Sequence, residues 1–293
     1  MTDRAVATAA TGLALYDRTA TDAASVVIAR YSTSFGLACR LLGPRVRPHV
    51  RTVYALVRVA DEIVDGPAAA AGLSPAAAGA LLDGLERETL EAIDRGFSAN
   101  LVVHAFARTA RECGIGADLI TPFFTAMRTD LTLAQHDAAS HDAYVYGSAE
   151  VVGLMCLQVF VNAGHAQPHA AEPGLVDGAR RLGRAFQDVN FLRDVDHDSR
   201  SLGRDYLALD RDTRTRGEVL DGIDADLAAA AATVPQLPAD CRRAVTAAHD
   251  LFAALSARLR TAGGDDRVRV PDGVKAVIAA RALLGLAPRA AQA

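Results

Sequence analysis

Apolar residues recur at helical spacing along most of the chain, and no segment alternates apolar and polar residues for long. This pattern predicts helices joined by short loops, and therefore an all-α architecture. The predicted helices cover residues 20–30, 48–65, 75–95, 99–113, 143–163, 175–198, 213–233, 239–261 and 273–286. Helical periodicity is also present over shorter stretches within 31–43 and 121–130.

Residues that start or stop helices mark the loops between these segments. A Gly-Pro pair ends the helix 48–65, and Ser74 with Pro75 supplies the N-cap and the first-turn proline of the next helix. The polar residues 134–142 predict a bend, and residues 164–174 form the clearest connector.

Two clusters of small or hydroxylated residues each allow two interpretations. The Ser/Thr cluster 32–34 can cap a helix or contact a ligand, and capping is the favoured interpretation. Small residues inside the predicted helix 143–163 favour close packing against a neighbouring helix, with a narrow cavity wall as the alternative. These small residues are Gly147, Ser148, Ala149 and Gly153.

An acidic pair occurs twice, each time inside an otherwise apolar helical segment. Asp61 and Asp65 are four residues apart in the first segment, and Asp194 and Asp198 have the same spacing in the second. On a helix each pair therefore lies on one face, where the like charges repel each other. Either water or a bound cation must relieve this repulsion.

The residues that share a face with each pair favour the cation. Tyr54 and Arg58 precede the first pair at helical spacing, and Gln187 and Asn190 precede the second. Carboxylate and amide oxygens suit Mg²⁺, which usually completes its coordination with water and substrate phosphate. Arg58 and Arg193 can bind further phosphate oxygens bidentately. One such pair alone is more often a solvated face, but two pairs on apolar helices predict a shared metal and phosphate site.

Such a site in an apolar helical bundle predicts a ligand with a strongly negative head and an apolar body. A prenyl diphosphate meets both requirements. Metal and arginine charges stabilise the departure of diphosphate, and apolar walls protect the resulting allylic cation from water. Phe35, Tyr54 and Tyr144 are aromatic candidates for stabilising that cation, although each is equally explicable as a core residue.

Composition and charge exclude several other classes of protein. The chain has 293 residues, 51% of them hydrophobic, and we expect one domain over 1–293 with residues 1–15 poorly ordered. The net charge is −4, Lys275 is the only lysine and the arginines are dispersed, so no nucleic-acid partner is expected. The sequence contains no dinucleotide-binding or P-loop motif and no zinc-binding spacing.

Cysteines and apolar runs bear on location. The four cysteines, at 39, 113, 156 and 241, are widely separated, which is typical of reduced core residues in an intracellular protein. The N-terminus lacks the apolar core of a signal peptide. The longest apolar run, near 151–160, is shorter than the roughly 20 residues that span a bilayer. We therefore expect a cytoplasmic protein, with peripheral membrane contact left open.

Four blocks of sequence occur in a characteristic order and spacing. They are YSTSF (31–35), YALVRVADEIVDG (54–66), YVYGSAEVVGLM (144–155) and QDVNFLRDVDHDSRSLGRDYL (187–207). Together they resemble the squalene/phytoene synthase family, and the second and fourth are most similar to bacterial phytoene synthases. The resemblance covers nearly the whole chain. It implies the all-α isoprenoid synthase fold, a single helical bundle around a central cavity with a Mg²⁺–diphosphate cluster at its mouth.

The resemblance also implies roles for individual residues of this chain. The metal ligands are then Asp61, Asp65, Asn190, Asp194 and Asp198. The residues facing the reacting carbons are Tyr54, Tyr144 and Gln187. Diphosphate contacts come from Arg58 and Arg193, with either Arg267 or Arg269 closing over the diphosphate. The segment near the cavity entrance contains Ser32, Ser34 and Phe35.

The implied reaction is a prenyl transfer in carotenoid biosynthesis. Two geranylgeranyl diphosphates condense head to head, through prephytoene diphosphate, to phytoene, and both diphosphates are released. Mg²⁺ is the expected cofactor, with Mn²⁺ as an alternative, and NADPH is not expected because the last step is a proton loss. Three alternatives stay open: a squalene or dehydrosqualene synthase using farnesyl diphosphate, a single-substrate terpene synthase, and a lipid-binding scaffold or subunit with the same fold. No obligate protein partner is evident.

Overall fold

The computed structural model describes residues 12–32, 34–133, 137–197, 206–207, 215–262 and 268–289. In this part of the chain every regular element is helical, as the periodicity predicts. The elements are α1 (Gly12–Tyr31), α2 (Ser34–Arg40), α3 (Arg47–Val64), α4 (Pro67–Ala70), α5 (Pro75–Arg95), α6 (Leu101–Cys113), α7 (Ala117–Thr132), α8 (Ala138–Val145), η1 (Tyr146–Glu150), α9 (Val151–Asn162), α10 (Pro173–His197), α11 (Arg216–Thr233), η3 (Val234–Gln236), α12 (Ala239–Thr261) and α13 (Asp272–Leu283).

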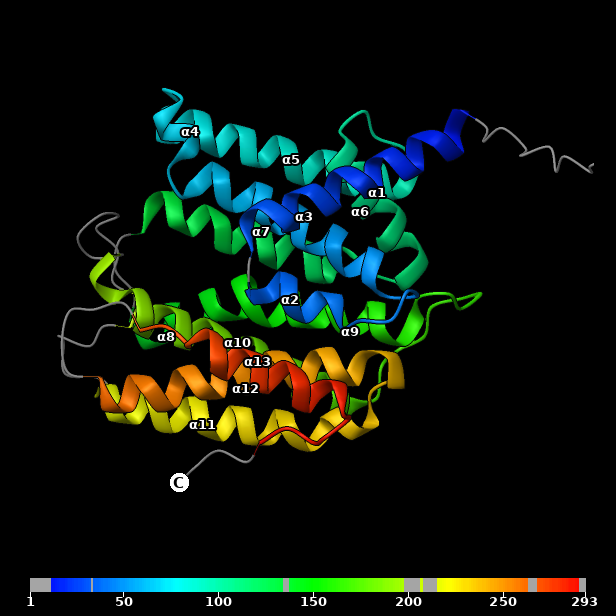
Figure 1. The fold of residues 1–293 in the computed structure, drawn as a ribbon. Helices are drawn as coiled ribbons and strands as arrows, with labels where there is room; N and C mark the ends of the chain where they lie inside the picture. Colours follow the sequence, from blue (N-terminus) through cyan, green and yellow to red (C-terminus); the bar gives the residue numbers. More distant parts are fainter. Residues whose placement is uncertain are drawn as a thin grey trace, which may run out of the picture.

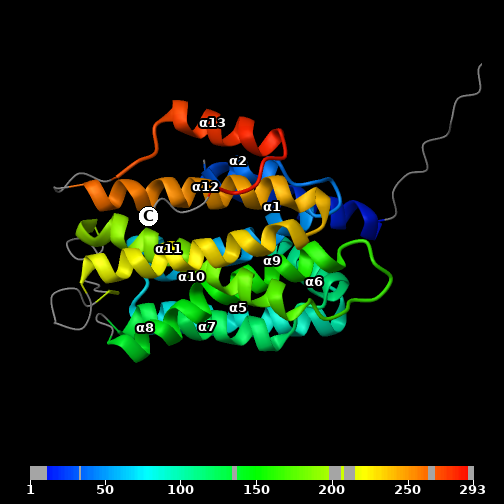
Figure 2. The ribbon, with the colours of Figure 1, turned by 90° about the horizontal axis from the view of Figure 1, so that it is seen from below.

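Most of the helices run roughly parallel or antiparallel in stacked layers (Figure 1). The helices α4 and α5 lie at one edge of the bundle and α11 and α12 at the other, with α2, α9 and α10 between them. The helix α13 packs outside α12 on one face of the molecule, as Figure 2 shows. The helix α3, which carries Asp61, and the helix α10, which carries Asp194, therefore belong to different layers, with α2 and α9 between them.

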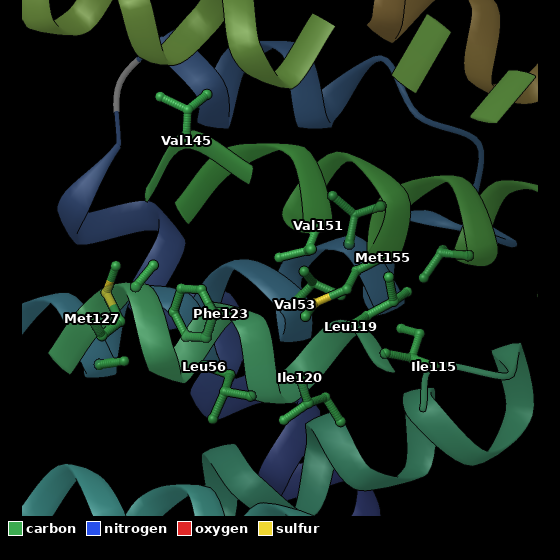
Figure 3. Close-up of a cluster of buried hydrophobic side chains, with 14 of the residues drawn as sticks. Val53, Leu56, Ile115, Leu119, Ile120, Phe123, Met127, Val145, Val151 and Met155 are labelled. Carbon is green, nitrogen blue, oxygen red and sulfur yellow. The ribbon is translucent and has the colours of Figure 1, made fainter. Parts of the chain in front are cut away.

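One cluster of the main hydrophobic core lies where α3, α7 and α9 meet (Figure 3). Val53 and Leu56 come from α3, Ile120 and Phe123 from α7, and Met155 from α9. All five side chains are almost completely buried. Burial of each large apolar side chain contributes about 1.5–3 kcal/mol, so this core holds α3 firmly against α9.

Some helix boundaries agree closely with the sequence prediction. The helix α5 begins after Ser74, whose side chain accepts a hydrogen bond from the Ala77 backbone N–H, and it has Pro75 in its first turn. It ends at Gly96, which adopts the left-handed conformation at φ 80°. The helix α12 covers Ala239–Thr261, the same residues as predicted.

Two predicted boundaries are wrong. The helix α7 begins at Ala117 rather than near residue 121, and Pro122 lies inside it, where its ring removes one helical hydrogen bond. The predicted bend 134–142 contains the start of α8, because Asp137 and Ser140 form a capping box that begins this helix. Residues 134–136 lie outside the described part of the chain.

The predicted helix 143–163 contains a π-helical segment, η1, between α8 and α9. Glycines let this region approach its neighbours closely. A Cβ atom on Gly147 would lie 2.5 Å from the Pro122 carbonyl oxygen, and one on Gly153 would lie 2.6 Å from the Ala179 carbonyl oxygen. The packing interpretation of the small residues is therefore confirmed. The cavity described below is lined in part by Ser148, Ala149 and Gly153, so the alternative also holds.

One helical stretch of the described chain, Ala139–Asn162, is long and apolar enough to cross a bilayer by length and composition alone. Half of its most apolar window is buried inside the fold, as in a core helix. At the N-terminus, α1 begins at Gly12, within the stretch 1–15 for which poor order was expected, and residues 1–11 lie outside the described part.

Candidate active site

A cavity of about 740 Å³ lies between α2, α3, α9, α10 and α12. Its walls are mainly apolar, with Val53 and Val57 from α3, Leu182 from α10, and Leu251 and Leu255 from α12. Polar side chains from α3, from the C-terminal half of α10 and from Ser32, just before α2, also line the cavity, and we call this region the polar end. Its members are Ser32, Tyr54, Arg58, Gln187, Asn190 and Arg193.

The helix α3 places the first acidic pair just beyond the polar end. Arg58 lines the cavity, and Asp61 follows it by about one helical turn. The backbone N–H of Asp65 donates to the Asp61 carbonyl oxygen at 2.8 Å, so the two acids stay one turn apart although the helix ends at Val64. Asp61 is partly buried and Asp65 is exposed.

The surroundings of Asp61 disfavour its charge. Burial of the carboxyl group raises its pKa most, the charges of Asp65 and Asp130 raise it further, and Arg58 opposes them. The resulting pKa is about 7. The ionised carboxylate is therefore poorly compensated by the protein alone, and a divalent cation would provide the missing positive charge.

Arg58 lies between the acidic pair and the cavity. Its guanidinium forms an ion pair with Glu62 and stacks on the Tyr31 ring, 4.6 Å from the ring centroid. Its Nε is buried and has no hydrogen-bond partner. Because unpaired buried donors are rare in folded proteins, this N–H is well suited to donate to a ligand oxygen.

The segment at the start of α2 caps a helix and lines the cavity. The Ser32 Oγ accepts hydrogen bonds from the backbone N–H groups of Phe35 (3.1 Å) and Gly36 (3.3 Å), which confirms the favoured capping interpretation. The ring of Phe35 stacks on Tyr54 with the centroids 5.8 Å apart, and both residues line the cavity. The side chain of Ser34 lies outside the described part of the structure.

The helix α10 forms a second polar wall of the same cavity. Gln187, Asn190 and Arg193 all line it. The Arg193 Nε donates to both carboxylate oxygens of Asp194, at 3.1 and 3.2 Å. Asp194, the first acid of the second pair, therefore already forms an ion pair with Arg193. Asp198, the outer acid, lies outside the described residues.

Two residues beside the site were not singled out from the sequence. Asp130, near the end of α7, accepts hydrogen bonds from the hydroxyl groups of Tyr144 and Tyr206, each at 2.8 Å. The Tyr206 ring stacks on Phe191 of α10 with the centroids 4.3 Å apart. Since the charge of Asp130 also raises the pKa of Asp61, this network adjoins the first acidic pair.

Tyr144 occupies a different place from the other candidate residues. It is buried beside Asp130 and is not among the described residues that line the cavity. Burial, followed by the negative charge of Asp130, raises the pKa of its phenol well above the ordinary value. The Tyr144 side chain is therefore a neutral hydrogen-bond donor at physiological pH.

The segment that leads into α13 adds cationic side chains. Arg269, which is exposed, and Lys275, which is half-buried, both line the cavity. The Lys275 Nζ lies 3.1 Å from an Asp272 carboxylate oxygen. Arg267, the other candidate for closing over a diphosphate, lies outside the described residues.

The acidic residues fit a cation that is bound together with phosphate. Among the described residues, no group of three or more His, Cys, Asp or Glu side chains is placed to hold a metal ion alone. Mg²⁺ does not need such a cage, because one or two carboxylates, water and substrate phosphates usually bind it. Asp61 and Asp65, one turn apart with the charge of Asp61 poorly compensated, form a donor set of that kind.

Comparison with known proteins agrees with this site. The squalene/phytoene synthase family model matches residues 28–222. The 15-cis-phytoene synthase of Paracoccus sp. is 29% identical over 259 residues, which cover 80% of this chain and 81% of the relative. Phytoene synthase of Arthrospira platensis and phytoene synthase 2 of Oryza sativa are each 32% identical over 63% of this chain. The matched regions make up 59% and 44% of those two relatives, or about half their length.

Solved structures agree at the level of the fold. The crystal structure of a dehydrosqualene synthase is similar with a TM-score of 0.74 and 21% identity, over 92% of this chain and 98% of that one. A squalene synthase from Alicyclobacillus acidocaldarius has a TM-score of 0.70 and 19% identity, over 84% and 95%. The helices around the cavity thus form the isoprenoid synthase fold, and with the family match over most of its length the chain belongs to the squalene/phytoene synthase family.

Proposed function

We propose that the protein is a prenyltransferase that joins two geranylgeranyl diphosphates head to head to give phytoene, in carotenoid biosynthesis. The observation that carries this proposal is the apolar cavity of about 740 Å³, with arginine and amide side chains at one end and an acidic pair beside them. A cavity of this kind suits a ligand with a long apolar tail and a diphosphate head. The phytoene synthases among the relatives support the same reaction.

The polar end binds the diphosphates. Arg58 from α3 and Arg193 from α10 donate to phosphate oxygens, and Arg269 adds a further cation beside the cavity. Arg267 keeps its expected place as an alternative to Arg269. The residues that would hold Mg²⁺, or Mn²⁺, are Asp61, Asp65, Asn190, Asp194 and Asp198. When bound, the metal neutralises negative charge on the departing diphosphate.

The apolar walls control the carbon chemistry. Departure of the first diphosphate leaves an allylic cation, which the double bond of the second substrate attacks. Loss of a proton from the resulting cation closes the cyclopropane ring of prephytoene diphosphate. Departure of the second diphosphate, rearrangement to the central linkage and loss of a proton give phytoene. The walls exclude water, which would otherwise quench the cations. The stacked rings of Phe35 and Tyr54 present aromatic surface to the passing positive charge.

The remaining polar residues orient the substrates. Gln187 reaches the cavity from α10, and Ser32 lines it beside Phe35. Gln187 and Tyr54 face the reacting carbons, and Ser34 keeps its expected role in the segment near the entrance. Tyr144 acts from beside the cavity, where its hydroxyl group donates a hydrogen bond to Asp130. The departing diphosphate accepts the final proton, so the reaction needs no reductant and NADPH is not required.

The proposal extends to the whole molecule. The chain acts as one domain, and the main core joins residues from α1 through α12. A cytoplasmic location with peripheral membrane contact is consistent with this chemistry, because the substrates and the product are lipids.

Incubation of the purified protein with farnesyl or geranylgeranyl diphosphate, each with and without NADPH, tests the function. We expect phytoene from geranylgeranyl diphosphate with Mg²⁺, no dependence on NADPH, and no product in EDTA. Squalene or dehydrosqualene from farnesyl diphosphate would support the thirty-carbon alternative, and a terpene from one substrate would support the single-substrate alternative. No product from either diphosphate would reject all three enzymes and leave the lipid-binding scaffold.

A further inference from the structure

The helix α13 packs on the rest of the molecule through a small apolar contact. Ile278 and Ala282 lie against Ala247 of α12, and this cluster is separate from the main core. Two of its three buried side chains are alanines, which bury little apolar area. A hollow of about 20 Å³ lies between α13, α2 and α12. On the outer side, Val277 and Leu283 are exposed at 51% and 53%. Apolar packing alone therefore holds α13 weakly.

A buried acid of α12 lies beside the C-terminal end of α13. Asp250 is 1% exposed, and its Oδ1 accepts a hydrogen bond from the backbone N–H of Arg289 at 2.8 Å. The same oxygen lies 3.0 Å from the Nδ1 of His249, which is equally buried. The Nε2 of His249 is 3.1 Å from the carbonyl oxygen of Leu227 in α11. Asp250 therefore fastens the segment that follows α13 to α12, and His249 connects this point to α11.

The second oxygen of this acid faces an arginine of α13 without a completed hydrogen bond. The Arg281 Nε lies 3.9 Å from the Asp250 Oδ2. Both atoms are buried, and neither has a hydrogen-bond partner. Unpaired buried polar atoms are rare in folded proteins. An approach of α13 by about 1 Å would bring the two atoms to the separation of about 2.8 Å that is typical of charge-assisted hydrogen bonds.

The same helix connects this acid to the cavity. Lys275 lines both the cavity and the hollow beneath α13, and Arg269, just before the helix, also lines the cavity. Arg281 follows Lys275 by six residues in the regular helix, or about 9 Å along its axis. A shift of α13 toward α12 at Arg281 therefore also moves Lys275 at the cavity wall.

We propose that Asp250 is a positioning residue that anchors α13 on α12 and so holds Arg269 and Lys275 against a bound diphosphate. This inference rests on the proposed function, because it assumes that the cavity binds diphosphate. The anion attracts the two cations, α13 closes over the hollow, and the Arg281 Nε donates to the Asp250 Oδ2. Asp250 is not among the described residues that line the cavity, so it acts through α13 rather than on the substrate.

Two substitutions remove the contact from opposite sides. Arg281→Gln takes away the donor and leaves the other hydrogen bonds of Asp250 in place, whereas Asp250→Asn takes away the charge of the acceptor. We expect either variant to weaken the binding of inorganic diphosphate with Mg²⁺ about tenfold, the size of effect of one hydrogen bond to a charged group. The KM for prenyl diphosphate should rise by the same factor, with kcat changed by less than about threefold.

Arg289→Gln is the matched control. It removes a neighbouring positive charge from an exposed side chain but keeps the backbone N–H that donates to Asp250. Diphosphate affinity and KM should therefore stay at wild-type values. An equal loss of affinity in Arg289→Gln would show a general effect of charge and would overturn the anchoring role.

Hydrogen–deuterium exchange of the α13 amides measures closure independently of activity. Diphosphate with Mg²⁺ should slow this exchange in the wild-type protein and in Arg289→Gln, and much less in Arg281→Gln. Unchanged affinity and unchanged protection in Arg281→Gln would overturn the proposal. If Asp250→Asn does not fold, Arg281→Gln decides alone. A wild-type protein that binds diphosphate and protects α13 but makes no hydrocarbon would reject the proposed function and leave the anchoring role intact.

Discussion

At the scale of single residues, the raised pKa of Asp61 sets folding stability against the proposed metal binding. Its carboxyl group is partly buried next to two other acids, and its pKa is about 7 in the folded protein against an ordinary value of 3.8. The folded state therefore holds this proton more tightly than the unfolded chain does. By linkage, the contribution of Asp61 to folding stability falls as pH rises from about 4 to about 7.

Asp61→Asn should separate the two effects. We expect the variant, free of metal at pH 8, to melt a few degrees above wild type, because the uncompensated charge is gone, and the difference should shrink at pH 5. Turnover should fall by about two orders of magnitude or more, since metal stabilisation of a leaving group is worth several kcal/mol. Melting curves at both pH values and a product assay measure these effects.

Asp22→Asn provides the control, because Asp22 is an exposed aspartate on α1. Such a surface substitution usually changes stability by less than about 0.5 kcal/mol, so both melting and turnover should stay at wild-type values. Wild-type turnover in Asp61→Asn would remove this residue from the metal site.

The carboxylate of Asp130 supports a second prediction at this scale. Tyr144 and Tyr206 both donate to it, so either Tyr→Phe change leaves the carboxylate with one donor fewer. A hydrogen bond to a charged group is worth about 1.5–3 kcal/mol, and each variant should lose stability of that order in urea unfolding. Because both hydroxyls share one acceptor, the double variant should deviate from additivity, whereas strict additivity would show two independent contacts.

Helical spacing predicted which side chains share a face, but not which side chains from other helices join them. Arg58 and Asp61 were identified because α3 is regular through both. Asp130 and Tyr206 are 76 residues apart in sequence, and their contact depends on how α7 meets the end of the fourth block. No local pattern encodes such a contact. The only available signals were an acid at the end of an apolar segment and a tyrosine inside a matched block.

At the scale of elements, the contact between η1 and α10 is set by backbone rather than by side chains. A Cβ atom on Gly183 would lie 2.6 Å from the Ala149 carbonyl oxygen. Beside this contact, Arg180 and Arg184 of α10 donate to the buried Glu150 carboxylate, at 2.7 and 2.9 Å. The position of α10, and with it the second polar wall, therefore depends on a close approach that only glycine permits.

Gly183→Ala should force the two elements apart. Overpacking costs about 1–3 kcal/mol, which exceeds the roughly 0.5–1 kcal/mol that alanine gains over glycine within a helix. We expect lower stability together with lower turnover. The paired control is Gly84→Ala in α5, where the nearest neighbouring atom is 4.0 Å from the added Cβ atom. No overpacking results, so the greater helix propensity of alanine should raise the stability. Chemical denaturation of both variants checks the opposite signs, and a stabilised Gly183→Ala would contradict the close approach.

Element boundaries were predictable where local chemistry decides them. Ser74 with Pro75 starts α5 as predicted, because capping acts within a few residues. The π-helical segment η1 was not predicted, because its apolar periodicity differs little from that of an α-helix over five residues. The start of α7 was misplaced because Thr121 followed by Pro122 is typical of a helix start, whereas the helix begins at Ala117 and contains Pro122.

At the scale of the whole molecule, two helices from different layers supply one cavity, so ligand binding should stabilise the fold globally. With free ligand at about 100 times its Kd, the gain is about 2.7 kcal/mol. We expect Mg²⁺ with inorganic diphosphate to raise the melting temperature by several degrees, and EDTA to reverse the rise. Asp61→Asn should lose most of this shift, and a shift that survives both EDTA and the substitution would show that the anion binds without the metal pair.

The fold class and the pairing of the acidic helices with one cavity were predictable, because periodicity and motif order determine them. The depth of the cavity was not. It depends on where Leu175 and Leu237, which are distant in sequence, pack together. Such a distance is a property of the assembled bundle.

Lys275 is the one lysine side chain at which the protein can be labelled through an amine. The sequence has one lysine, and its amino group lies on the cavity wall beside Asp272. Amine-reactive dyes will therefore label this position and the chain's own amino terminus, and the two labels fall on separate tryptic peptides. A fluorophore attached there would report tail entry through a change in its emission, without any engineered cysteine.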